Sequence, residues 1–82
     1  MDGFIMVNDE ILQANKAALP LDDRGFLFGD SIFETMIALD HKIVFLKNHV
    51  DRLFFSARLA EIPIPWKPDQ LKESLQNMVK KV

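Results

Sequence analysis

The fold of this chain is decided by the stretch IFETMIALDHKIVFLKNHVDRLFFSARLA, residues 32–60, in which the hydrophobic period changes from two to about 3.6. Residues 32–39 are rich in β-branched and aromatic side chains and predict a strand, which the next two residues turn into a second strand over residues 42–45. From Leu46 onwards the stretch predicts a helix with one apolar stripe. The stripe consists of Leu46, Val50, Leu53, Ala57 and Ala60.

The elements on either side complete the predicted secondary structure. Upstream, residues 4–7 and 10–13 predict two short strands around a tight turn at Asn8 and Asp9, which tolerate positive φ. Downstream, Pro68 is expected to open a second amphipathic helix. Its apolar face consists of Leu71, Leu75, Met78, Val79 and Val82. The predicted fold class is therefore α+β, an antiparallel β-sheet built from hairpins with two packed α-helices.

Local signals predict the loops and the start of the first helix. Gly25 and Gly29 are expected to break any regular element after the first hairpin, and Gly29 to allow close backbone packing. Asp23 and Arg24 are expected to hold the loop that ends in Gly25 rather than to take part in chemistry. Asn48 is the expected cap of the first turn of the helix.

Composition and charge narrow the classes of function. At 82 residues the chain can bury only roughly 60–65% of its unfolded surface, so we expect it to pack against a partner chain or domain. It has no cysteine, and no histidine–carboxylate pair has zinc-like spacing, so we expect no metal site. A net charge of −2 with scattered Lys and Arg argues against nucleic acid and membrane partners, and no apolar run could span a bilayer. We expect a cytoplasmic protein.

Three polar residues stand out as a candidate site. Arg52 carries a permanent charge and a planar fork of donors that suits a phosphate, although a solvated surface arginine is the alternative. His49 precedes it by three residues, so both lie on the same side of the predicted helix. Glu34 falls on an otherwise apolar face of its strand and needs a partner. We therefore predict a hydrogen-bonded cluster of the three that orients the arginine; a water-facing edge glutamate and a capping histidine are the alternatives.

Two runs of sequence resemble a known family. The runs are DRGFLFGDSIFET, residues 23–35, and HVDRL, residues 49–53. They are similar to the N-terminal domain of class IV (fold type IV) pyridoxal-phosphate enzymes, which include branched-chain and D-amino-acid aminotransferases and aminodeoxychorismate lyase. The resemblance extends from about Phe4 to the C-terminus and implies the N-terminal small domain of a D-amino-acid-aminotransferase-like fold. It also implies that Arg52 binds the phosphate of pyridoxal 5'-phosphate.

The same resemblance implies a substrate pocket and a partner. Phe28, Phe33 and Thr35 would contribute to the pocket for amino-acid and 2-oxo-acid substrates, where aromatic walls suit an apolar side chain and the Thr hydroxyl can take a hydrogen bond. Plain core packing is the alternative for the two phenylalanines. The family often has tyrosine at one of these positions, and the absence of tyrosine here leaves the choice of substrate open. Family members are commonly homodimers, and we expect the same here.

The lysine that carries the cofactor in this family is expected to lie beyond residue 82. Each lysine of the chain is predicted in a loop, at a hairpin end or at an exposed helical position, where burial would not make its amine nucleophilic. These are Lys16, Lys42, Lys47, Lys67, Lys72, Lys80 and Lys81. Residues 1–82 would then be the N-terminal domain of an aminotransferase, a fragment that lacks the catalytic-lysine domain and is inactive alone. An aminodeoxychorismate-lyase-type enzyme and a non-catalytic dimerisation or binding module are the alternatives.

Overall fold

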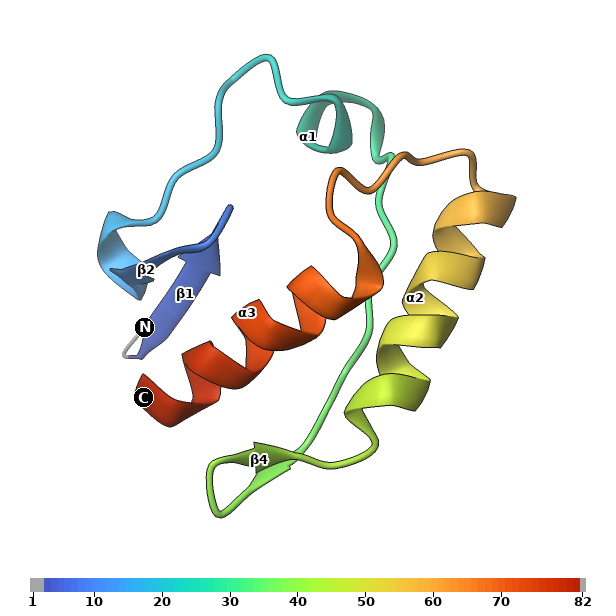
Figure 1. The fold of residues 1–82 in the computed structure, drawn as a ribbon. Helices are drawn as coiled ribbons and strands as arrows, with labels where there is room; N and C mark the ends of the chain where they lie inside the picture. The colour runs from blue at the N-terminus through green and yellow to red at the C-terminus, as the bar shows by residue number, and fades with distance from the viewer. Residues whose placement is uncertain (1–2, 82) are drawn as a thin grey trace. The chain divides into compact units, whose positions relative to one another are not determined.

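The computed structural model describes residues 3–81 and consists of two compact units (Figure 1). The first unit ends at Asp30, and the second runs from Ser31 to Lys81. Each unit contains an antiparallel hairpin, and the second adds two long helices, so the predicted α+β class is confirmed. The two hairpins form separate two-stranded sheets. No helix in the described part of the chain is long and apolar enough to cross a membrane.

The hairpin of the first unit joins β1, Phe4–Val7, to β2, Glu10–Gln13, as predicted. Asn8 and Asp9 form the turn with φ values of 48° and 74°, in the left-handed region that two-residue hairpin turns favour. A 3-10 helix, η1, Ala14–Lys16, follows β2 directly. The turn chemistry of two adjacent residues thus sets the register of this hairpin.

A short helix, α1, Arg24–Phe28, corrects the expectation that glycines break all regular structure in this region. Gly25 lies inside the helix, where a Cβ would meet the Asp30 carbonyl oxygen at 3.1 Å. Gly29 ends the helix with a φ of 70° and donates its N–H to the Gly25 carbonyl oxygen at 2.9 Å. A Cβ on Gly29 would meet nothing within 4 Å, so close backbone packing occurs at Gly25 and not, as predicted, at Gly29.

The hairpin of the second unit is shorter than predicted. β3, Ala38–Leu39, pairs with β4, Lys42–Ile43, around the predicted two-residue turn, but residues 32–37 lie outside any strand. The reason lies at Phe45, whose φ of 55° turns the chain out of the ladder and into the next helix. β4 therefore ends before it can pair with residues 32–36.

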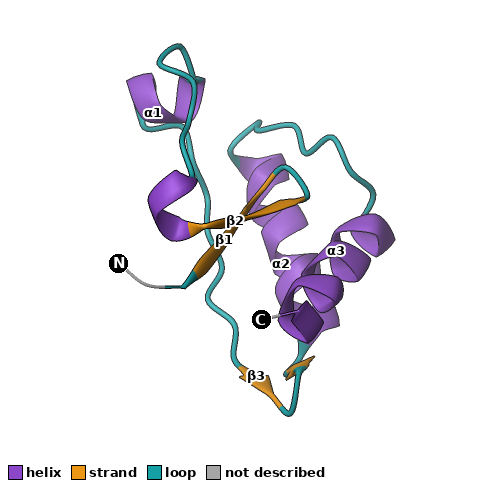
Figure 2. Cartoon of the chain, turned by 90° about the vertical axis from the view of Figure 1, so that its left-hand side faces the viewer, coloured by secondary structure: helices purple, strands orange, loops and turns teal. Residues whose placement is uncertain are grey.

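Two helices provide the core of the second unit. α2, Leu46–Leu59, packs against α3, Pro68–Lys81 (Figures 1 and 2). Val50 and Ala57, from the stripe predicted on α2, are buried. The described residues of the face predicted on α3 are half-buried; they are Leu71, Leu75, Met78 and Val79. Val82, also assigned to that face, lies outside the described residues.

The start of α2 differs from the prediction. Its N-cap is Phe45, which makes no side-chain capping bond, whereas Asn48, the predicted cap, is the third residue of the helix. α3 begins at Pro68 as predicted, and Gln70 Oε1 accepts the backbone N–H of Lys67 at 2.8 Å, one half of a capping box. Ala60, the last residue of the predicted stripe, is the C-cap of α2 and is exposed.

The β3–β4 turn is fixed to α3 through His41. Its Nδ1 lies 3.1 Å from the Val79 carbonyl oxygen, and Gln76 Nε2 donates to the His41 carbonyl oxygen at 2.8 Å. With its proton on Nδ1, His41 donates to a carbonyl in the last turn of α3, which has no partner within the helix. These contacts hold β4, and hence the start of α2, beside α3.

Candidate functional site

The predicted polar cluster is assembled within the second unit from two elements. Glu34 comes from the segment before β3, and His49 and Arg52 lie in the first and second turns of α2. Because three residues make nearly one helical turn, His49 and Arg52 lie on one side of α2, with Arg52 Nη2 3.4 Å from His49 Nδ1. The structure thus brings together the three residues that the sequence predicts as a cluster.

Glu34 is the centre of this cluster. Its Oε2 accepts from Arg52 Nε at 2.8 Å and its Oε1 accepts from Arg52 Nη2 at 2.7 Å, which makes a bidentate pair. Its Oε1 also lies 2.7 Å from His49 Nδ1. Since an ionised carboxylate can only accept, His49 Nδ1 carries a proton and donates. The longer contact between His49 and Arg52 is then the proximity of two donors and not a hydrogen bond.

The cluster has a buried side and an open side. The Glu34 side chain is 9% exposed, whereas that of Arg52 is 64% exposed. Arg52 Nη1 makes no hydrogen bond to any other described residue. The edge of the guanidinium formed by Nη1 and the second hydrogen of Nη2 is therefore available to an anion.

The charges of the cluster stabilise one another. Hydrogen bonds from Arg52, and then from His49, lower the pKa of Glu34 from 4.5 to about 2. The hydrogen bond to Glu34 in turn raises the pKa of Arg52. Both groups are therefore charged at neutral pH, and the guanidinium is held by a carboxylate that stays ionised.

The local sequence explains why the carboxylate faces inward. Ile32, Glu34 and Met36 are half-buried, while Phe33 and Thr35 between them are exposed. This is the period of two expected for an extended chain, in which successive side chains take opposite faces. The two faces predicted for the segment are therefore observed, although the segment is not part of a strand ladder.

The residues predicted for a substrate pocket are all exposed. Phe33, 86% exposed, and Thr35 lie on the face opposite Glu34. Phe28, 73% exposed, is the last residue of α1 in the first unit. Neither phenylalanine is packed in the core of the described residues. Asp23, which was expected to be structural, accepts the Leu27 N–H on its carbonyl oxygen at 2.9 Å at the start of α1.

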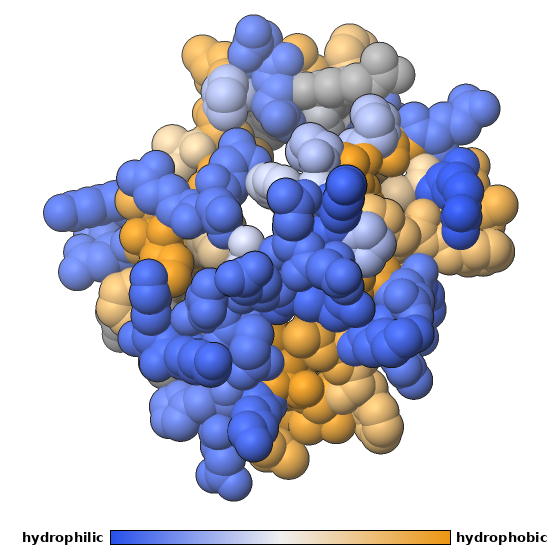
Figure 3. Space-filling view, in the orientation of Figure 1, coloured by the Kyte–Doolittle hydropathy of each residue, from blue (hydrophilic) through white to orange (hydrophobic). Residues whose placement is uncertain are grey.

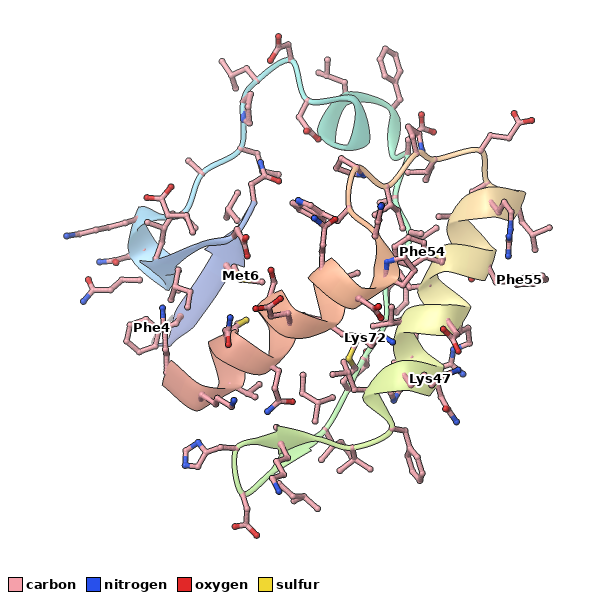
Figure 4. All side chains as sticks on the ribbon, viewed as in Figure 1. Phe4, Met6, Lys47, Phe54, Phe55 and Lys72 are labelled. Atoms are coloured by element: carbon pink, nitrogen blue, oxygen red, sulfur yellow. The ribbon has the colours of Figure 1, made fainter. Side chains whose placement is uncertain are left out.

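Two lysines near the α2–α3 contact are paired with carboxylates. Lys47 Nζ donates to Asp51 Oδ2 at 2.7 Å, which raises the pKa of Lys47. Lys72 lies between α3 and α2 in Figure 4, with its Nζ 3.2 Å from Asp69 Oδ1 and its side chain 25% exposed. The expectation that Lys72 lies at an exposed helical position is corrected, because helix packing covers its methylene stem.

An apolar groove in the first unit was not predicted from the sequence. It has a volume of about 510 Å³ and is lined by Ile5, Val7, Ala17, Ala18, Leu19 and Leu21. The sequence feature that could have predicted part of the groove is the spacing of two between Ile5 and Val7, which places both side chains on one face of β1. None of these lining side chains can bind a phosphate. Among the described residues, no three His, Asp or Glu side chains gather as a metal site.

Comparisons with known proteins show which family and which proteins this chain resembles. The model of the family described as amino-transferase class IV matches residues 31–82. The D-alanine aminotransferase of Listeria monocytogenes serotype 1/2a (strain 10403S) is 31% identical over 75 residues, which cover 92% of the chain and 26% of that protein. The D-alanine aminotransferase of Staphylococcus haemolyticus is 28% identical over 76 residues, covering 93% and 27%. A Methanocaldococcus jannaschii protein described as a branched-chain-amino-acid aminotransferase is 34% identical over 67 residues, covering 82% and 23%. The chain spans about a quarter of the length of these relatives.

Proposed function

The chain belongs to the class IV amino-transferase family, whose model matches more than half of its residues, and from this premise we propose that it is the N-terminal part of a pyridoxal-phosphate-dependent amino-acid aminotransferase. The observation that carries the proposal is the cluster of Glu34, His49 and Arg52. In this cluster the permanently charged guanidinium of Arg52 is bound by the Glu34 carboxylate through Nε and Nη2. Its Nη1–Nη2 edge is exposed to solvent. Such an edge suits the phosphate of the cofactor.

The donor set of Arg52 fits a phosphate group. A guanidinium has five N–H donors in a planar fork, and Glu34 uses two of them, on Nε and Nη2. The remaining edge can hold two oxygens of one phosphate at once, a geometry that arginine supplies and lysine does not. The exposure of Arg52 leaves this edge accessible, so the residues present are consistent with the cofactor.

In the proposed role, one residue of the cluster binds the cofactor and the other two hold that residue in position. Arg52 binds the phosphate, Glu34 holds the plane of the guanidinium, and His49 fixes the carboxylate by donating to Oε1. When bound, pyridoxal phosphate supplies an electron-withdrawing ring for chemistry at the substrate Cα. We propose that the lysine that moves the substrate proton lies outside residues 1–82.

A series of substitutions at Arg52 in the full-length protein tests the phosphate site. Arg52→Ala should weaken pyridoxal-phosphate binding by about tenfold to a hundredfold, because a charge-assisted pair of hydrogen bonds is lost. Arg52→Lys should recover part of this loss, because an ammonium keeps the charge and loses the fork. Equilibrium titration followed by cofactor absorbance measures both effects.

The matched control is Arg58→Ala. Arg58 is exposed in the last turn of the same helix, away from the cluster, so its removal should change cofactor affinity by less than about twofold. If Arg52→Ala binds the cofactor as tightly as the wild type, the phosphate-site proposal is wrong. If Arg58→Ala loses as much affinity as Arg52→Ala, the effect is one of general charge or folding.

Two substrate types are supported by different relatives. The relatives named D-alanine aminotransferase support D-alanine as substrate, and the branched-chain relative supports a branched-chain amino acid. We propose that Phe33 lies against the substrate side chain and that the Thr35 hydroxyl donates one hydrogen bond. Assays of the full-length protein with D-alanine and with L-leucine, each with 2-oxoglutarate, separate the two. Consumption of neither, with cofactor bound, would favour a lyase.

A further inference from the structure

Glu34 and Arg52 are connected to opposite ends of the β3–β4 hairpin. Three residues separate Glu34 from β3, and two separate β4 from α2, the helix that carries Arg52. A backbone hydrogen bond from Val44 N to the Ile37 carbonyl oxygen, at 2.8 Å, closes the hairpin at its base. The position of this hairpin therefore affects where the carboxylate and the guanidinium meet.

The turn of the same hairpin is bound to α3. His41 Nδ1 lies 3.1 Å from the Val79 carbonyl oxygen, and Gln76 Nε2 donates to the His41 carbonyl oxygen at 2.8 Å. Because residues three apart lie on one side of a helix, both contacts reach the same side of α3. We call these two contacts the turn clamp. They lie at the surface, where Figure 3 shows hydrophilic side chains over much of α3.

α3 supports α2 as well as the hairpin. The two helices pack together, and α3 also packs against β4 (Figure 1). The hairpin needs this support, because its ladder is only two residue pairs long and an isolated hairpin is marginally stable. A carboxylate and a guanidinium joined by two hydrogen bonds, in turn, need a defined separation and a common plane. Movement of the hairpin relative to α3 would disturb both.

We propose that the turn clamp positions the guanidinium of Arg52: by fixing the hairpin to α3, it keeps the Glu34 carboxylate where Nε and Nη2 of Arg52 can both donate to it. This inference deepens the proposed function and rests on it, because the oriented guanidinium is the group proposed to bind the cofactor phosphate. His41 and Gln76 are positioning residues, which act on Arg52 through the hairpin.

Exchange of the Arg52 Nε–H with solvent, followed by heteronuclear NMR of the full-length protein without cofactor, tests the clamp. Glu34 Oε2 accepts this proton at 2.8 Å, so it exchanges slowly while the pair is intact. His41→Gly removes the ring and keeps the turn, because φ at residue 41 is 62° and glycine adopts this value without strain. Gln76→Ala removes the other contact and leaves a good helix former in α3. In each variant the exchange should be about threefold to tenfold faster.

The matched control is Glu73→Gly, at an exposed position of α3 outside the clamp. A glycine inside the helix weakens α3 but leaves both clamp contacts in place, so the exchange should stay within about twofold of the wild type. Exchange at the wild-type rate in either His41→Gly or Gln76→Ala would overturn the proposal. Equal acceleration in Glu73→Gly would also overturn it, because the effect would then be one of general stability.

Titration of the two clamp variants with pyridoxal phosphate separates this inference from the proposed function. A less ordered guanidinium should lower cofactor affinity by about threefold, because more conformational freedom is lost on binding. Faster exchange with unchanged affinity would uphold the clamp and contradict the phosphate site. Unchanged exchange, with weaker binding after Arg52→Ala, would overturn the clamp and uphold the phosphate site.

Discussion

Glu34 is a nearly buried carboxylate whose burial is tolerable because two donors of α2 reach it. Arg52 supplies two hydrogen bonds and His49 supplies one, so the ionised form is stabilised strongly enough to outweigh desolvation. The same bonds restrict the rotation of the guanidinium. The arrangement therefore orients Arg52 before any anion binds, which reduces the conformational cost of binding.

Replacing Glu34 should change how stability depends on pH. Its pKa is lowered to about 2 from 4.5, so its contribution to stability is complete above about pH 4.5 and is lost as the pH falls through about 2. In Glu34→Gln that contribution is absent. The difference in free energy of unfolding between wild type and variant should thus be constant above pH 4.5 and shrink below it. Urea unfolding of the full-length protein at a series of pH values measures this difference.

The control is Glu73→Gln, at an exposed position of α3. Removing a solvated carboxylate there should leave the dependence of stability on pH nearly unchanged. A difference for Glu34→Gln that stays constant down to pH 2 would show that the carboxylate is not held by its two donors in solution.

Among the elements, α2 has an unusual start. Phe45, its N-cap, adopts φ 55° and ψ 38°, a left-handed conformation that costs a bulky residue about 1–2 kcal/mol. The side chain is 72% exposed, so little packing within these residues offsets that cost. The turn is nevertheless what separates β4 from α2 and places His49 in the first turn of the helix.

Phe45→Gly should therefore raise the free energy of unfolding, by about 0.5–1 kcal/mol, because glycine adopts positive φ without strain. Phe55→Gly is the matched control, since it removes the same side chain from an exposed position inside α2 and should cost about 1 kcal/mol. Thermal unfolding of the two variants in the full-length protein compares them. Destabilisation by both to a similar extent would mean that Phe45 packs against a part of the protein outside this chain.

At the scale of the whole molecule, the two units bury little apolar surface. Among the described residues, Val50 and Ala57 make up the buried core, and many large apolar side chains are exposed in both units. Exposure on this scale is typical of surfaces that meet another domain or subunit. We propose that the full-length protein is a homodimer, and sedimentation equilibrium measures whether it is.

The 82-residue chain on its own should show no transaminase activity and no saturable attachment of pyridoxal phosphate. All lysines of the chain except Lys72 are exposed, and Lys72 lies beside Asp69. Asp51 raises the pKa of Lys47, so the amine of Lys47 stays protonated and cannot act as a nucleophile. Borohydride reduction followed by peptide mass spectrometry measures attachment. Stoichiometric modification of a single lysine would contradict this expectation, whereas weak labelling spread over several surface lysines agrees with it.

The amino-acid sequence by itself determined the features that depend on a few neighbouring residues. Asn8 and Asp9 favour positive φ and so define the first turn, and the spacing of apolar residues defines the buried side of α2. The period of two around Glu34 and the interval of three between His49 and Arg52 were enough to predict that these side chains meet. Such patterns can be recognised in a sequence because side chains return to the same face about every 3.6 residues in a helix and every two residues in a strand.

Tertiary structure alone decided where β3 and β4 end and how α2 begins. β3 and β4 are two residues long because pairing stops where Phe45 leaves the ladder, and a strand exists only where another chain segment supplies hydrogen bonds. The half-burial of Lys72 likewise follows from the approach of α2 to α3. Neither property can be predicted from one element alone, because each depends on the position of a second segment of the chain.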